Sequence, residues 1–156
     1  MSLETISWLS MAAYAYHILE EYSFDWRNWA RSALHLPVEW SDFYITNAIV
    51  IAFGIVQAQL AATLPLAPLS FAALMLINAV FFHILPFIRL KGRFSPGLFT
   101  AVVLFVPISL AAFAAALASK QVGWPTVGFS VLIGALTMAF PVVMLKLRSR
   151  RYFQQA

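Results

Sequence analysis

The sequence contains no cysteine, few charged residues and no acidic residue beyond position 42. The absence of cysteine excludes disulfide bonds, thiolate metal sites, cysteine nucleophiles and the thioether attachment of c-type haem. Charged residues make up 10% of the chain and hydrophobic residues 62%, whereas soluble domains contain about 25% charged and about 45–50% apolar residues. A soluble protein of 156 residues could not bury so much apolar surface. The composition therefore predicts an integral membrane protein.

Long apolar stretches predict where the chain crosses the membrane. A spanning helix needs about 20 mostly apolar residues, and four stretches meet this need plainly. A fifth, at the N-terminus, is less apolar because it carries His17 and the acids Glu4, Glu20 and Glu21. Prolines near the ends of the stretches mark the helix limits. We expect an all-α bundle of five transmembrane helices, a single domain over 1–156, with spans at about 3–22, 43–64, 68–90, 96–119 and 125–147.

The basic residues predict the orientation of this bundle. Cytoplasmic loops of membrane proteins are enriched in Lys and Arg. With the N-terminus outside and the C-terminus cytoplasmic, nine of the ten basic residues lie inside, and only Lys120 lies outside. The basic cluster Lys146, Arg148, Arg150 and Arg151 then serves as a topogenic signal that contacts anionic lipid, and we expect no nucleic-acid partner. The expected location is the cell (inner) membrane, with membrane lipids as partners.

The connection 23–41, between the first two spans, has an amphipathic pattern. Trp26 and Trp29 recur at helical spacing, with Arg27 and Arg31 on the opposite face. This pattern is typical of a short helix that lies in the membrane interface.

The first span ends in an acid–histidine cluster, His17-Ile18-Leu19-Glu20-Glu21. Positions i+3 and i+4 of a helix share a face with position i, so both glutamates flank His17. A carboxylate at the centre of a membrane helix costs about 2.5–3.5 kcal/mol, and less near the interface. Two adjacent carboxylates therefore favour a neutralising metal ion, proton or other cation, unless the side chains simply extend to the interface.

Polar residues of other spans are predicted at a similar depth. His83 lies six residues before Arg89, which places it about 9 Å into the membrane. Asn47 and Thr100 lie equally close to the cytoplasmic ends of their spans. Four helices thus carry a polar group at one level of the cytoplasmic leaflet, and Asn47 is a candidate contact for a bound cofactor.

Pro86 predicts a bend beside His83. Proline cannot donate a hydrogen bond to the carbonyl of Phe82, four residues earlier, so the helix should open there. Asn78 lies about 140° around an ideal helix from His83. Asn78 is therefore a second candidate cofactor contact only if the bend rotates it towards the site.

These residue types predict a divalent metal site, with Zn²⁺ first and Fe or Mn as alternatives. In a mononuclear site, His17, His83 and Glu20 would hold the ion, and Glu21 would be the catalytic general base for a bound water. In a dinuclear site both glutamates would be ligands, as in di-iron helix bundles. The Glu-x-x-His order of those proteins is reversed in this chain. The mononuclear and the dinuclear arrangement both remain open.

The motif His17-Ile-Leu-Glu20-Glu21 near the start of a small membrane protein resembles the HXXEE-domain family. The resemblance extends to the stretch 78–83 and to Arg93-Phe94-Ser95-Pro96-Gly97, which opens the fourth span. Phe94 stands where a tyrosine is expected. The resemblance implies a role for His17, Glu20, Glu21 and His83, and it implies no particular reaction.

The leading hypothesis is a membrane-embedded, metal-dependent enzyme that hydrolyses a lipidic or apolar small molecule through a metal-bound water. The alternatives are a di-iron oxidoreductase, a proton- or cation-coupled carrier that uses the two glutamates, and a haem b protein with His17 and His83 as axial ligands. A structural membrane subunit is a further alternative. The alanine-rich fourth span would allow close helix packing within a protomer or in a homo-oligomer.

Overall fold

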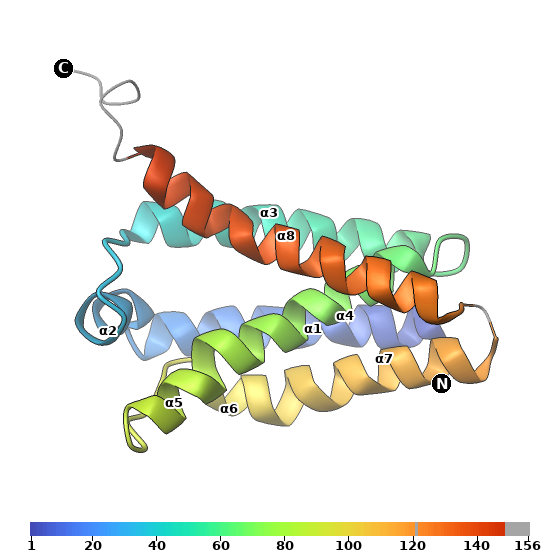
Figure 1. The fold of residues 1–156 in the computed structure, drawn as a ribbon, viewed down its shortest axis with the longest axis horizontal. Helices are drawn as coiled ribbons and strands as arrows, with labels where there is room; N and C mark the ends of the chain where they lie inside the picture. Colours follow the sequence, from blue (N-terminus) through green and yellow to red (C-terminus); the bar gives the residue numbers. More distant parts are fainter. Residues whose placement is uncertain (121, 149–156) are drawn as a thin grey trace.

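The computed structural model describes residues 1–120 and 122–148, and over these residues the chain is helical without strands (Figure 1). The prediction of an all-α protein is confirmed. Arg150 and Arg151 of the predicted basic cluster lie outside the described residues. In chain order the elements are α1 (Leu3–Ser23), α2 (Trp26–Ala33), α3 (Trp40–Leu60), α4 (Leu66–Asn78), the π-helix η1 (Ala79–Ile84), α5 (Leu85–Arg89), α6 (Leu98–Thr100), the π-helix η2 (Ala101–Phe105), α7 (Val106–Ala118) and α8 (Trp124–Arg148).

Four helical stretches are long and apolar enough to cross a membrane, and they match the four plain apolar stretches of the sequence to within a few residues. Helix α1 has 21 residues, but polar side chains lower its hydropathy and it is not among these four. Four spans are therefore supported, whereas a membrane-crossing α1 stays a prediction. The four stretches are Trp40–Leu60, Leu66–Arg89, Leu98–Ala118 and Trp124–Leu147.

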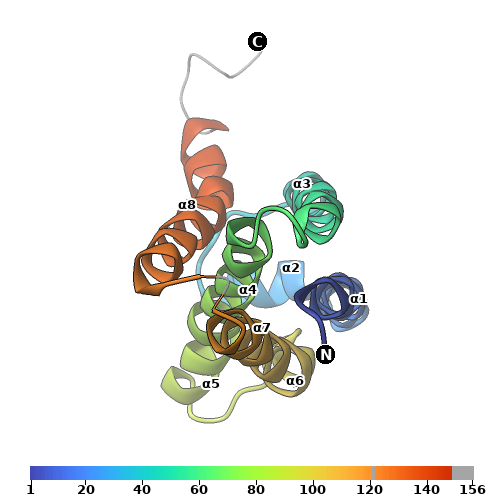
Figure 2. The same ribbon diagram turned by 90° about the vertical axis from the view of Figure 1, so that its right-hand side faces the viewer.

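Helix α4 lies at the centre of the bundle, with α1, α3, α7 and α8 around it (Figure 2). Its side chains are buried on nearly all sides, as expected for a helix that is hydrophobic all round. Helix α8 packs against α4 at Gly134, where an added Cβ would lie 2.7 Å from the backbone nitrogen of Leu74. The rest of α8 is largely exposed, and its apolar surface suits contact with lipid.

In each of the two spans Leu66–Arg89 and Leu98–Ala118, a π-helical segment precedes a proline. The segment η1 ends just before Pro86, and η2 ends just before Pro107. A proline lacks the N–H of an α-helical turn, and a wider turn accommodates that loss. The opening predicted at Pro86 thus takes the form of a π-helix that contains His83, and η1 packs against η2. Single π-turns frequently occur at functional sites.

The predicted helix in the first connection is present as α2. Trp29 and Ala30 of this helix form a small buried cluster with Val38. Two arginines of α2 bind Glu39, the residue that precedes α3. Arg27 Nε donates to Glu39 Oε2 at 2.9 Å, and the Arg31 guanidinium donates to Glu39 Oε1 at 2.7 Å. These ion pairs hold α2 against the start of α3.

The ion pairs of Glu39 predict a pH dependence. The hydrogen bond from Arg27, aided by both positive charges, lowers the pKa of Glu39 below its ordinary value. A carboxyl whose pKa is lowered on folding stabilises the fold above its unfolded-state pKa of about 4.3. That stabilisation disappears as the pH falls through the lower, folded-state pKa. In detergent, we expect a slightly lower melting temperature for Glu39→Gln than for wild type near pH 7, because exposed pairs contribute little. The difference should shrink as the pH falls below the unfolded-state pKa of Glu39, and a difference that is independent of pH would contradict this assignment.

Candidate metal centre

His17 and Glu21 lie one turn apart on the buried face of α1. The exposed fraction is 1% for His17 and 7% for Glu21. Their i, i+4 spacing turns both side chains towards the interior, where His17 Nε2 lies 3.5 Å from Glu21 Oε1. A charged group so poorly exposed requires a compensating partner.

His83 reaches the same carboxylate from η1. Its Nε2 lies 3.6 Å from Glu21 Oε1, and its side chain is fully buried. The two imidazole rings meet edge to face with centroids 4.8 Å apart. One carboxylate oxygen therefore faces two imidazole nitrogens from two different helices.

The turn Ser95-Pro96-Gly97 closes the centre from a third side. Ser95 Oγ lies 3.1 Å from His83 Nδ1. Gly97 has φ +92°, and a Cβ added there would lie 2.6 Å from Cε1 of both His17 and His83. Only glycine combines this backbone conformation with so close an approach to both rings.

Glu20 occupies a different place from the one predicted. Its carboxylate accepts hydrogen bonds from the backbone nitrogens of Phe99 at 3.1 Å and Thr100 at 2.8 Å, and from Thr100 Oγ1 at 2.6 Å. Adjacent helical residues point about 100° apart, so when Glu21 faces the histidines, Glu20 faces the start of α6. Glu20 is therefore not among the side chains that converge with His17 and His83, and the predicted division of roles between the two glutamates does not match this arrangement.

Thr100 connects Glu20 to His17. Thr100 has one hydroxyl proton, and the 2.6 Å contact with Glu20 uses it. His17 Nδ1, 2.8 Å from the same oxygen, must then be the donor. This hydrogen bond places the ring proton on Nδ1 and leaves a lone pair on Nε2, directed towards Glu21. Such outer contacts typically orient a metal-binding histidine.

The three converging side chains fit a divalent metal ion. The ligand atoms of His17, Glu21 and His83 all lie within 4.8 Å of one another. Both Nε2 atoms are buried and lack a hydrogen-bond partner within the described part of the chain. Their separations from Glu21 exceed a hydrogen bond, but they match the spacing of about 3.4 Å that tetrahedral Zn²⁺ ligands would have. Three protein ligands and one open position are typical of catalytic zinc.

The role of Thr100 gives a prediction. Thr100→Val removes the hydroxyl that orients His17 and should weaken metal affinity about 10–100-fold. Thr100→Ser keeps the hydroxyl and should bind metal nearly as wild type does. Metal titration of the purified protein, followed by its thermal stability, measures the difference. Equal affinity in the Val and Ser variants would contradict the proposed link.

The two predicted asparagines lie beside the centre rather than in it. Asn47 Oδ1 accepts the hydroxyl proton of Tyr14 at 2.8 Å, and its amide donates to the carbonyl of Phe43. Asn78 is buried, and its Oδ1 has no partner among the residues that the structure describes. Neither belongs to the group that could hold an ion.

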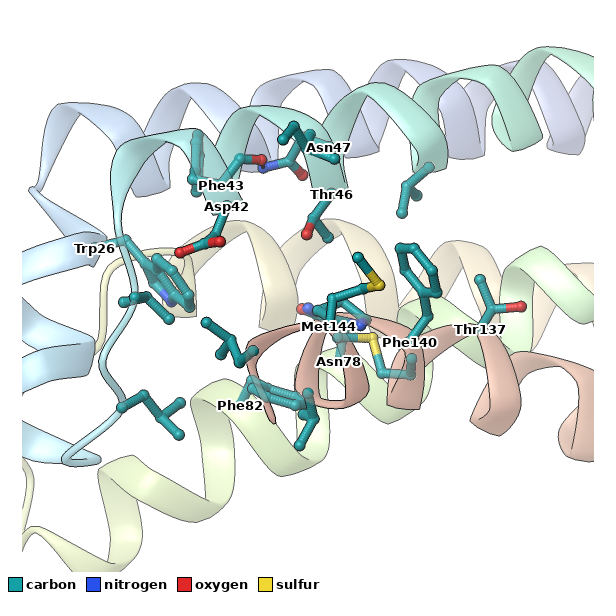
Figure 3. A pocket seen from close by; sticks show the side chains of 18 of the residues that line it. Trp26, Asp42, Phe43, Thr46, Asn47, Asn78, Phe82, Thr137, Phe140 and Met144 are labelled. Atoms are coloured by element: carbon teal, nitrogen blue, oxygen red, sulfur yellow. Dashed lines mark hydrogen bonds between the residues drawn. The ribbon is translucent and has the colours of Figure 1, made fainter. Parts of the chain in front are cut away.

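A cavity of about 360 Å³ adjoins the centre, between α3, α4 and α8. Glu21 lines it, together with Asn47 and Asn78. Figure 3 shows Asn47 and Thr46 on the α3 side of this space, with Asn78 and Met144 across from them. The carboxylate that faces the two histidines therefore also borders an apolar cavity.

The sequence predicts Thr100 at the same level as His17, and the structure brings Thr100 Oγ1 within 2.8 Å of His17 Nδ1. The sequence predicts no role for Ser95 or Gly97 in the centre. A glycine that follows a proline immediately before a helix is a signal of positive φ. That signal could have indicated a close backbone approach, although the two rings that Gly97 approaches become visible only in the fold.

No curated protein and no solved structure matches the chain. The family described as "Protein of unknown function with HXXEE motif" matches residues 8–112, more than half of the sequence. The matched region contains His17, Glu20, Glu21 and His83 as well as the turn 95–97. The chain therefore belongs to the HXXEE family, as the motif on α1 predicts.

Proposed function

We propose that this protein is a membrane-embedded, metal-dependent enzyme that hydrolyses an apolar or lipidic small molecule. One observation carries the proposal, namely that a buried His17–Glu21–His83 group lies next to an apolar cavity that Glu21 also lines. Ligand pockets of enzymes are mostly apolar and contain a few converging polar groups. The centre and the cavity together have this character.

In this proposal His17, Glu21 and His83 hold the ion, with Zn²⁺ preferred over Fe or Mn. A divalent ion bound there would supply a Lewis acid and activate water for hydrolysis. Thr100 and Ser95 orient the two imidazoles through their Nδ1 atoms. The Glu21 carboxylate would offset part of the metal charge. Because Glu21 faces both histidines, we now assign it first as a ligand.

The geometry disfavours two of the alternative functions. A haem between His17 and His83 would need a slot for the macrocycle, whereas the rings contact each other at a centroid separation of 4.8 Å. A di-iron centre needs several carboxylates. In the described residues, Glu21 is the one carboxylate that converges with the imidazoles, since Glu20 binds the start of α6.

A proton- or cation-coupled carrier is supported by one feature, a row of buried polar residues along α1. Ser7, Ser10, Tyr14 and His17 follow one another at helical spacing. The two serine hydroxyls donate to carbonyls of their own helix, however. The Gln57 amide nitrogen likewise donates to the carbonyls of Ser7 and Gly54. These hydrogen bonds use the groups that a proton path along α1 would need. We therefore prefer the metal-dependent enzyme to the carrier.

We further propose that α1 is a fifth span and that the centre lies in the cytoplasmic leaflet of the cell membrane. Helix α1 runs alongside α3 and α7 (Figures 1 and 2), and its 21 residues would extend about 31 Å, close to the thickness of the hydrocarbon core. Helix α2 and the connection 90–97 lie at the same end of the bundle, opposite the N-terminus. Most basic residues lie at that end, which is the cytoplasmic one by the positive-inside rule.

Metal content and hydrolysis test the proposed function together. We would purify wild type, Glu21→Gln and the control Glu4→Gln without chelator, measure bound metals, and assay a panel of lipid esters. Glu4 is an exposed acid at the other end of α1, so it controls for loss of a carboxylate. We expect about one metal ion per chain and ester hydrolysis in wild type and Glu4→Gln, and neither in Glu21→Gln. Wild type without metal, or hydrolysis unaffected by Glu21→Gln, would refute the proposal.

A further inference from the structure

The cavity beside the centre lies between two of the four apolar spans, α3 and α8. Helix α8 packs closely on α4 at Gly134, where an added Cβ would lie 2.7 Å from the backbone nitrogen of Leu74. Every residue of α8 that lines the cavity follows this contact, within the range 137–147, and the lining residues of α3 lie within 42–50. The cavity therefore lies between the C-terminal half of α8 and the N-terminal half of α3.

Side chains of the first connection cover the end of the cavity near α2. Trp26, Leu36 and Val38 line this end, and Figure 3 shows Trp26 at the margin of the space. Val38 belongs to the buried cluster of α2, and Leu145 of α8 packs against the same cluster. The arginines of α2 bind Glu39 and hold the helix in this position. A ligand dissolved in water would therefore have to displace this cluster to enter from that end.

The side of the cavity between α3 and α8 continues to the outer surface of the bundle. The lining residues Ile45, Phe140 and Met144 are exposed, although they belong to apolar spans. Exposed apolar surface on a spanning helix suits contact with the hydrocarbon of the bilayer. Val50 and Leu74 line the same cavity and are buried. The apolar wall therefore runs from the surface that faces lipid to the interior of the bundle.

We infer that the acyl chain of a membrane lipid enters this cavity laterally from the bilayer, through the gap between α3 and α8. The cavity lies at the end of the bundle that carries α2, which is the cytoplasmic end in the proposed orientation. Glu21 borders the same cavity, so a lipid would reach the metal centre without passing through water. This inference rests on the proposed function, for which it names the substrate class as a lipid that resides in the bilayer.

Photolabelling from inside the bilayer tests this route. The full chain is placed in phosphatidylcholine nanodiscs that contain a phosphatidylcholine with a diazirine in one acyl chain, and mass spectrometry locates the adducts formed on irradiation. A water-soluble diazirine is the second probe. Thr46→Trp and Met144→Trp fill the gap from α3 and from α8. Their controls, Ile49→Trp and Val143→Trp, place the same bulk at exposed positions of these helices that do not line the cavity.

We expect lipid adducts on the buried residues Val50 and Leu74 in wild type and in both controls, and loss of these adducts in Thr46→Trp and Met144→Trp. The exposed Phe81, which does not line this cavity, should be labelled in every variant and serves as the reference. The water-soluble probe should leave Val50 and Leu74 unlabelled. Wild type labelled at Phe81 but not at Val50 and Leu74, labelling of these two by the water-soluble probe, or equal labelling of cavity variants and controls would overturn the inference.

This measurement requires neither a bound metal nor hydrolysis, so the two proposals can fail separately. Adducts in a protein that binds no metal would leave the acyl-chain site in place and refute the enzyme. Metal and hydrolysis without the adducts would leave the enzyme in place and refute lateral entry. If a second copy of the chain covered the gap, the exposed lining residues Ile45 and Phe140 would also lack lipid adducts, which would likewise refute lateral entry.

Discussion

Gly97→Ala is expected to disrupt the centre and to lower the free energy of unfolding by about 2–5 kcal/mol. Two costs add at this position. The backbone has φ +92°, which disfavours any residue with a Cβ, and the Cβ itself would lie 2.6 Å from Cε1 of both His17 and His83. At least one imidazole must move, and with it the nitrogen that faces Glu21. We therefore expect loss of metal as well as a lower melting temperature in detergent.

Gly92→Ala is the matched control for this experiment. Gly92 has nearly the same backbone conformation, φ +88°, but the nearest atom to an added Cβ is Phe87 Cζ at 3.9 Å. This variant should show the backbone cost alone, about 1–3 kcal/mol, with normal metal content. If Gly97→Ala bound metal as Gly92→Ala does, the close approach of the turn to the two rings would have no functional role.

His83→Ala is expected to abolish stoichiometric metal binding. The loss of a direct ligand should cost more than the 10–100-fold in affinity that is typical of an outer contact. Metal bound to the native state at 100 times its Kd stabilises that state by about 2.7 kcal/mol. Wild type should therefore melt at a lower temperature after treatment with a chelator, whereas the melting temperature of His83→Ala should not respond.

His35→Ala is the control, because His35 is exposed and lies in the connection between α2 and α3. It should bind metal and respond to the chelator as wild type does. A chelator response retained in His83→Ala would show that the ion is held elsewhere, and would remove His83 from the centre.

Much of the architecture follows from local sequence properties. The four most apolar helices end within a few residues of the predicted limits, because hydrophobic length and proline placement are local signals. The sequence also predicts that α1 carries site residues, since His17, Glu20 and Glu21 are polar residues at helical spacing in an apolar stretch. Whether α1 crosses the membrane is harder to predict, because the same polar residues lower the hydropathy of this helix.

By itself, the sequence predicted an all-α chain with five transmembrane helices, of which the structure supports four. It also indicated His17, the two glutamates and His83 as candidate site residues. Only the tertiary structure decided which glutamate meets the histidines. Residues 20 and 21 both lie within one turn of His17, and the packing of η1 and α6 against α1 turns Glu21 to His83 and Glu20 to Thr100. The roles of Ser95 and Gly97 and the cavity beside Glu21 also depend on this packing. They arise from contacts between segments far apart in the chain, which helical periodicity does not encode.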